Sequence, residues 1–286
     1  MGFVPFPLHL GVSFFYLSSP KAILILSTIR FISNSFDFSF LFCYEAATIL
    51  LILATVSLGA IFKTNLPRST MIGLNISYPN YGYIGIPMSL IAFGTDAALP
   101  LASILLADTV ILLTFSSFFI AISEQKKSII DLFYNLLKRI ISQPLLIAVC
   151  MGMFFSQLKI EIAPTVGVFI ETVSGAAAPV ALIALGASIT LKFPASQKLE
   201  LAVISIGKLI LHPCLIVLIF FIWPTDKIVW IQTAILCASL PVAANVFVLA
   251  GYYGSFKKES ANSIVLTTIL STFTVPVTLY FIFNLI

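Results

Sequence analysis

Charged residues are scarce in this chain. Only 9% of its 286 residues are Asp, Glu, Lys or Arg, whereas about a quarter of the residues of a typical soluble domain are charged. Hydrophobic residues account for 60% of the chain, and the mean hydropathy is +1.12. So little charge is not expected on a water-soluble surface, and the composition therefore predicts an integral membrane protein.

The chain also lacks the common motifs of membrane-embedded enzymes. It contains no HExxH, no aspartate-rich pair, no GxSxG and no Walker glycine–lysine loop. We therefore expect a protein that is not an enzyme and that uses no cofactor. Two alternatives stay open: a membrane enzyme that uses unrecognised residues, and a retinal-type receptor with Lys208 as the Schiff-base lysine.

Cysteine is sparse as well, and its spacing predicts no metal site. The cysteines lie within apolar stretches and form no CxxC pair. They are Cys43, Cys150, Cys214 and Cys237. We expect them to be small buried residues in helix packing rather than metal ligands or redox centres.

The chain does contain apolar windows that are long enough to cross a membrane as helices. A helix rises about 1.5 Å per residue and the hydrocarbon core is about 30 Å thick, so each crossing needs roughly 20 apolar residues. Nine windows qualify: Leu8–Thr28, Phe38–Phe62, Thr70–Phe93, Ala97–Ser123, Arg139–Leu158, Val166–Leu191, Leu201–Ile222, Val229–Ala250 and Asn262–Ile286. They are far longer than barrel strands of about 10 residues and show no polar–apolar alternation. The predicted fold class is therefore all-α, a multi-spanning helical bundle surrounded by membrane lipid.

The basic residues predict an orientation, because Lys and Arg near helix ends favour the cytoplasmic side. If the link between the fourth and fifth windows is cytoplasmic, that side holds Lys63, Arg68, Lys126, Lys127, Lys138, Arg139, Lys192, Lys198, Lys257 and Lys258, and the other side holds Arg30, Lys159 and Lys227. We expect a multi-pass protein of the cell membrane, a bacterial inner membrane, with its amino terminus cytoplasmic and its carboxyl terminus outside. This asymmetry explains the net charge of +4, so no nucleic-acid partner is predicted.

Helix breakers interrupt the third and eighth windows. The stretch "SYPNYGYIGIPMSLIAFG" (77–94) places prolines, glycines and an asparagine in the middle of the third window, and proline recurs in "SLPVAAN" (239–245). Proline cannot donate a backbone hydrogen bond, and glycine allows close backbone approach. Backbone groups freed in lipid must face protein, water or a ligand. These residues are therefore candidates for a substrate site, with two ordinary proline kinks as the alternative: Asn80, Gly82, Gly85, Pro87, Pro241 and Asn245.

Two weak sequence similarities within the chain predict an internal repeat. "SSPKAILIL" (18–26) is similar to "AAPVALIAL" (177–185), and "SYPN" (77–80) is similar to "SLPVAAN" (239–245) at nearly the same offset. The members of each pair run in opposite directions in the predicted topology, as in transporters built from inverted repeats. Paired interrupted helices mark the substrate site in such proteins. Chance similarity between apolar stretches is the alternative.

Five motifs together resemble the auxin efflux carrier family of secondary transporters, including its bacterial malonate-transporter-like branch. They are "PNYGYIGIP" (79–87), "GAAAPVALIALGASI" (175–189), "KLILHP" (208–213), "LPVAANVFVLAGYYG" (240–254) and "STFTVP" (271–276). The resemblance implies two inverted five-helix repeats in which the fourth and ninth helices are broken and cross at the substrate site. With nine helices present, the first family helix is expected to be absent. Residues 1–123 would form the incomplete first repeat, 124–138 a cytoplasmic link and 139–286 the second repeat.

Charged residues inside the windows are costly, about 2.5 to 3.5 kcal/mol each at a helix centre, so each needs a partner or a purpose. Lys21 and Glu45 lie at equal depth in consecutive windows and are expected to form an ion pair. Asp108 is a candidate for coupling transport to an ion gradient, and Lys208 for proton exchange or for attracting an anionic substrate. A satisfied polar residue inside the bundle is the alternative for both.

These observations predict a secondary active transporter that moves a small organic anion by alternating access around the crossing. The resemblance implies a malonate- or dicarboxylate-like or auxin-like substrate and coupling to H⁺ or Na⁺. A truncated, non-transporting remnant stays an alternative. The sequence leaves open the substrate, the direction of transport, the coupling ion and whether the protein is a homodimer.

Overall fold

The computed structural model describes residues 37–123, 134, 158, 163–170, 172–173, 197–252 and 254–285. The chain forms two compact units, one made of Met1–Phe36 and Lys138–Ile189 and the other of Asp37–Leu137 and Thr190–Ile286. Nearly all described residues belong to the second unit. It takes residues from both predicted repeats, whose boundaries stay a prediction.

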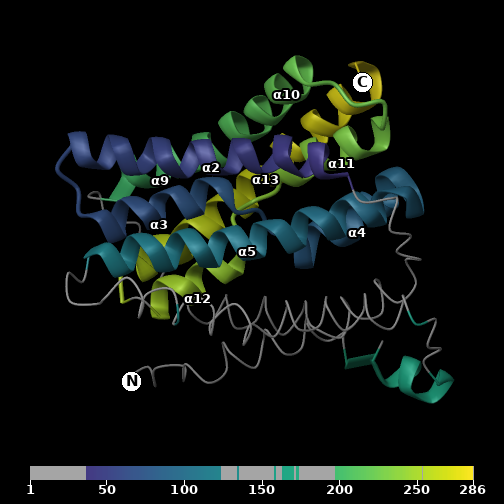
Figure 1. Cartoon of the computed structure of the whole chain (residues 1–286), viewed down its shortest axis with the longest axis horizontal. Coiled ribbons are helices and arrows are strands. Elements are labelled where there is room, and N and C mark those ends of the chain that lie inside the picture. The colour runs from purple at the N-terminus through teal and green to yellow at the C-terminus, as the bar shows by residue number, and fades with distance from the viewer. Residues whose placement is uncertain are drawn as a thin grey trace. The chain divides into compact units, whose positions relative to one another are not determined.

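The described residues of the second unit form helices joined by short links and two breaks (Figure 1). Its elements are α2 (Phe38–Ile61), α3 (Leu66–Ser77), η1 (Tyr81–Gly85), α4 (Ile86–Phe93), η2 (Gly94–Ala97), α5 (Ala98–Ser123), α9 (Lys198–Ile206), η4 (Gly207–Leu211), α10 (His212–Ile222), α11 (Ile228–Ser239), α12 (Ala244–Tyr252) and α13 (Lys257–Leu285). Four helical stretches are long and apolar enough to cross a membrane: Phe38–Ile61, Tyr81–Ile111, Lys198–Ile222 and Lys257–Asn284. The predicted all-α, membrane-spanning class is confirmed.

The structure describes helices for some of the predicted apolar windows and leaves others outside the described residues. Those at 38–62, 97–123, 201–222 and 262–286 correspond, within a few residues, to α2, α5, α9 to α10, and α13. The windows at 8–28, 139–158 and 166–191 lie wholly or mostly outside the described residues. The count of nine helices and the inverted repeats therefore stay predictions.

Helices α2, α3 and α5 lie side by side, with α3 between the other two (Figure 1). Glycines let α2 and α3 come close. A Cβ atom on Gly73 of α3 would lie 3.2 Å from the Cα of Ile52 in α2, and one on Gly59 would lie 2.6 Å from the Cβ of Ser69. Real Cβ atoms rarely approach backbone or other fixed atoms so closely, so this helix pair depends on the absence of side chains at both positions.

Two helices are broken where the sequence predicts breaks. Helix α3 ends at Ser77 and the chain becomes helical again at η1, while α11 ends at Ser239 and α12 begins at Ala244. The first break is centred on Pro79 rather than on Pro87. Pro87 instead lies in the first turn of α4, where a missing N–H is tolerated.

Both π-helical turns of the described chain come just before a proline. Element η1 ends two residues before Pro87, and η4 ends two residues before Pro213. A proline ring clashes with the carbonyl four residues earlier in an α-helix, and those carbonyls, of Tyr83 and Leu209, both lie within the π turns. The wider π turn provides room for the ring, so each helix continues past its proline.

Candidate functional site

The two helix breaks meet in a short antiparallel contact. Pro79 pairs with Val242 as an isolated β-bridge. The Asn80 N–H donates to the Pro241 carbonyl at 2.9 Å. The Ala243 N–H donates to the Tyr78 carbonyl at 3.1 Å. Each break thus provides hydrogen-bond partners for backbone groups of the other break. This pairing avoids the free-energy cost of unpaired backbone groups inside a membrane. We call this contact, residues 78–80 and 241–243, the crossing.

A threonine from a neighbouring helix braces each side of the crossing. In α13, the Thr267 hydroxyl donates to the Ser263 carbonyl at 2.7 Å and accepts the Val242 N–H at 3.1 Å. In α5, the Thr109 hydroxyl donates to a carbonyl of its own helix at 2.7 Å and lies 3.3 Å from the Tyr78 hydroxyl. Each threonine therefore fixes one break to a long, continuous helix.

Of the two predicted asparagines, Asn80 is part of the crossing and Asn245 lies two residues beyond it. Asn80 is buried, and its side-chain oxygen accepts the Tyr83 N–H at 3.4 Å, so it caps η1. Asn245 is half-buried, and its side chain interacts with the Tyr78 hydroxyl. The Asn80 amide oxygen thus accepts a hydrogen bond from one backbone group beside the break. Binding of a solute by either residue stays a prediction.

The predicted glycines and prolines divide into two groups. Pro241 is buried at the crossing, and a Cβ on Gly85 would lie 2.9 Å from a methyl carbon of Leu240. The Leu240 side chain therefore does come close to the backbone at Gly85, as predicted for a glycine at this position. Gly82 and Pro87 are exposed, and no described residue lies within 4 Å of a Cβ placed on Gly82. Among the described residues the side of η1 that faces the other break carries Gly85, and close approach at Gly82 stays a prediction.

Lys208 is completely buried and lies beside the second break. Its ammonium donates to the Ala238 carbonyl at 2.9 Å and is 2.9 Å from Nδ1 of His212. Ala238 is in the last turn of α11, where unpaired carbonyls give the helix end a partial negative charge. Lys208 thus caps a half-helix that ends inside the protein, and its predicted contact with an anionic substrate stays a prediction.

Glu45 and Asp108 bring two carboxyl groups together in the interior. Their side chains interact with each other, from α2 and α5, and the charge of Asp108 also acts on Lys208. The expected partner of Glu45 was Lys21, which lies outside the described residues. Sequence reasoning missed this contact because it compared only consecutive windows. Comparing the depth of Glu45 with that of Asp108 in α5 would have found the contact. Each residue lies two to three turns after the start of its helix, and both helices start on the same side of the predicted membrane.

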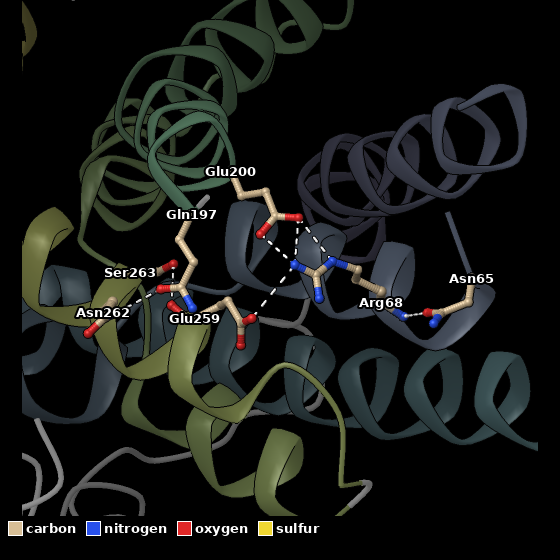
Figure 2. A network of polar contacts seen from close by, with 7 residues as sticks. All are labelled: Asn65, Arg68, Gln197, Glu200, Glu259, Asn262 and Ser263. Atoms are coloured by element: carbon tan, nitrogen blue, oxygen red, sulfur yellow. Dashed lines mark hydrogen bonds and ion pairs between the residues drawn. The ribbon is translucent and has the colours of Figure 1, made fainter. Parts of the chain in front are cut away.

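An ionic cluster joins α3, α9 and α13 at the end of the unit where these helices begin (Figure 2). The Arg68 guanidinium makes hydrogen bonds of 2.7 to 2.9 Å to both carboxylate oxygens of Glu200 and lies 3.6 Å from Glu259. The Arg68 N–H also donates to Asn65, which caps α3. Nearby, the Asn262 amide donates to Gln197 at 3.0 Å. This cluster ties the first half of the chain to the second.

A second ion pair lies at the start of α2 and α11. The Lys227 ammonium is 3.2 Å from Asp37 and 4.3 Å from the centre of the Trp230 ring. Burial raises the pKa of the Asp37 carboxyl, but a hydrogen bond from the Phe40 N–H and the Lys227 ammonium outweigh burial and hold that pKa below its ordinary value. Asp37 therefore stays ionised near neutral pH, where it caps α2.

We expect Arg68→Gln to lower the free energy of unfolding by about 1 kcal/mol, since the pair with Glu200 is half-exposed. The loss should shrink in high salt, which screens such pairs. Unfolding of purified protein in mixed micelles at two salt concentrations would measure it. Lys198→Gln removes one exposed positive charge from the same region and serves as the control. Equal, salt-independent losses in both variants would contradict the assignment.

No group of three or more His, Cys, Asp or Glu side chains in the described part of the chain is arranged to hold a metal ion. The crossing and its surroundings instead present backbone amides, asparagines and a buried pair of carboxyls beside one lysine. Such a set can hydrogen-bond a polar solute and hold a proton. It contains no pairing of a nucleophile with a base among the residues that form the crossing.

Comparison with known proteins gives two findings. The sequence profile of a family described as "Membrane transport protein" matches residues 23–279. The chain is also 33% identical over 230 residues to a protein of Rhizobium meliloti (strain 1021) named "Putative malonate transporter". That alignment covers 79% of this chain and 71% of the relative.

Proposed function

Because the chain belongs to the membrane transport protein family, the auxin efflux carriers recognised in its motifs, we propose that it is a secondary active transporter of a small organic anion. In this proposal the crossing binds the substrate, access alternates between the two sides of the membrane, and an ion gradient drives the cycle through Asp108. Family membership and the apolar helices show that the chain is a multi-pass membrane transporter.

The antiparallel contact between Pro79 and Val242 is the observation that carries the proposal. It brings the first residues of η1 and α12 together inside the unit, away from the ends of the long helices. Helix N-termini carry partial positive charge and free N–H groups, which favour an anion. Broken helices that meet near the membrane midplane are the usual substrate site of secondary transporters.

The symmetry of the crossing supports the inverted repeats. Each break donates one backbone N–H and accepts one at a carbonyl, and each is braced by one threonine, Thr109 in the first half and Thr267 in the second. Each broken helix is followed directly by one long helix, α5 or α13. A repeat of inverted topology produces such an arrangement, with the predicted repeats 1–123 and 139–286 meeting at the substrate site.

The ionic cluster around Arg68 supports the predicted orientation. It lies on the side where the positive-inside rule places Arg68 and Lys198, whereas the Asp37–Lys227 pair lies at the opposite helix ends. In the proposed topology the Arg68 side is cytoplasmic and the carboxyl terminus is outside. Among the described residues, each side of the membrane then has ion pairing between the two halves of the chain: Arg68 with Glu200 and Glu259 on one side, and Asp37 with Lys227 on the other.

Transport by reconstituted protein tests the site. We expect radiolabelled malonate to exchange across proteoliposome membranes by counterflow, since a relative carries that name. Asn80→Ala and Asn245→Ala should each reduce counterflow at least about tenfold, which corresponds to about 1.4 kcal/mol of lost interaction. Asn284→Ala is the matched control, because Asn284 is exposed and its amide bonds only to a carbonyl of its own helix, that of Tyr280.

Two results would speak against the proposal at different levels. Counterflow in both site variants equal to that of the wild type, with equal protein inserted, would remove the crossing as the binding site. Absence of counterflow in the wild type for malonate and for a panel of dicarboxylates and aromatic acids would remove the organic anion as the substrate class.

A further inference from the structure

Glu45 and Asp108 form a buried carboxyl pair for which the described part of the chain provides no hydrogen-bonding or ion-pair partner. Glu45 is 7% exposed and Asp108 is 0% exposed. None of the four carboxyl oxygens accepts a hydrogen bond from a donor in the described part of the chain, although the two groups interact with each other. The buried hydroxyl of Thr48, one turn after Glu45, also interacts with Asp108 and makes no hydrogen bond within the described part of the chain.

Among the described residues, the charge balance of the cluster leaves room for one more positive charge. Lys208, as an ammonium, contributes one positive charge beside Asp108. Lys208 Nζ is 2.9 Å from Nδ1 of His212, and because an ammonium can only donate, Nδ1 accepts and the ring is neutral while Lys208 is charged. Two carboxylates and one ammonium leave a net charge of −1 in a site of low dielectric, where an unbalanced charge is expensive. One proton between the carboxyls makes the cluster neutral and supplies the missing hydrogen bond.

We propose that Glu45 and Asp108 share one proton and that this pair carries the proton that drives transport. The inference rests on the proposed function and adds Glu45 as a coupling residue. In each cycle one carboxyl oxygen takes a proton from water on one side of the membrane, and the same O–H bond breaks to release the proton to water on the other side. The protein itself is unchanged after each cycle.

Both carboxyl residues are joined to the crossing through their neighbours in the chain. Tyr44 precedes Glu45, and its hydroxyl lies 3.0 Å from that of Tyr81, the residue after Asn80. Thr109 follows Asp108 and contacts Tyr78. A change at the carboxyl pair therefore reaches the first break at Tyr78 and Tyr81, on either side of Asn80, through side chains one residue away, and occupancy of the crossing reaches the pair by the same contacts.

Among the described residues, the groups that surround the pair come from every element packed against it. They are Tyr44 and Thr48 from α2, Tyr78 from the first break, Lys208 from η4, His212 from α10 and Cys237 from α11. Within this set the lysine carries the charge, and the tyrosines, threonine and cysteine are neutral near neutral pH. Because the two carboxyls contact each other directly, a proton fits between them more readily than a sodium ion with its larger ligand shell.

A transport measurement separates proton coupling from substrate binding. Proteoliposomes would be assayed for malonate counterflow and for malonate accumulation driven by an imposed pH gradient. We expect Glu45→Gln to lower the ratio of gradient-driven accumulation to counterflow at least tenfold relative to the wild type, and Asp108→Asn to do the same. Asp96→Asn is the control, because Asp96 is an exposed carboxyl at the start of the α5 region.

Infrared spectroscopy of the purified protein tests the shared proton without any transport. A carbonyl band of a protonated carboxyl that shifts in D₂O should be present in the wild type and in Asp96→Asn. It should disappear in Glu45→Gln, because the remaining Asp108 then pairs with Lys208 as a carboxylate. Persistence of the band in Glu45→Gln, an unchanged transport ratio, or accumulation driven by a sodium gradient instead of a pH gradient would each overturn the inference. If wild-type protein moves no malonate but shows the band, the substrate assignment fails and the proton pair stands.

Discussion

Lys208→Met should be the most damaging single change in the described unit, lowering the free energy of unfolding by about 3 to 5 kcal/mol. Methionine keeps the length of the side chain but removes its charge and donors. The Ala238 carbonyl then loses its bond at the end of α11, and the carboxyl pair loses its neighbouring positive charge. Unfolding of the purified protein in mixed detergent micelles would measure the difference.

A double-mutant cycle distinguishes this cause from loss of packing. If the ammonium balances Asp108, then Lys208→Met combined with Asp108→Asn should be less destabilised than the sum of the two single changes. Lys258→Met is the control, because Lys258 is exposed at the start of α13, and its effect should stay within about 0.5 kcal/mol. Strict additivity in the cycle would mean that Lys208 acts on the helix end alone.

Gly73→Val should be the next most damaging change, with a loss of about 1 to 3 kcal/mol from forced separation of two helices. The new Cβ would lie 3.2 Å from the Cα of Ile52, a backbone atom that cannot move without displacing α2. The intrinsic helix propensity of valine exceeds that of glycine, so any loss measured understates the steric cost.

Gly82→Ala provides the matched comparison for Gly73→Val. No described residue lies within 4 Å of a Cβ at Gly82, which is also a helical glycine. Alanine there should leave the free energy of unfolding unchanged or raise it by up to about 1 kcal/mol. The same micelle unfolding measurement applies. A stable Gly73→Val protein, or a destabilised Gly82→Ala protein, would contradict the packing described for the glycines.

Hydropathy and helix breakers were enough to predict the membrane class and the position of the crossing. An apolar window contains few polar residues and few prolines, so Asn80, Asn245 and Pro241 are conspicuous in it. All three lie in or directly beside the crossing. The centre of the first break was predicted less well. Pro87 attracted attention as a breaker, but a π turn accommodates it, and the break occurs at Pro79, whose partner is on the second half of the chain.

The interior polar contacts could be predicted only in part, for two physical reasons. Hydropathy does not encode which helices are neighbours, so Glu45 was assigned to the adjacent window rather than to Asp108 in α5. The partner of Lys208 is a backbone carbonyl, that of Ala238, and every residue has one. Only the three-dimensional position of the break in α11 makes that carbonyl available, so no residue pattern could identify it.

The crossing also sets the order in which the molecule can be completed during synthesis. Pro79 and Val242 are 163 positions apart, and the two backbone hydrogen bonds beside them span nearly the same distance along the chain. Until α11 and α12 have been made and inserted, the backbone groups of Tyr78 and Asn80 lack these partners, which costs several kcal/mol per group in hydrocarbon. The first break therefore lacks its backbone hydrogen-bond partners until the second half of the chain is inserted. The pairing of residues 78–80 with 241–243 is thus a late step in folding, and it stabilises both breaks at the same time.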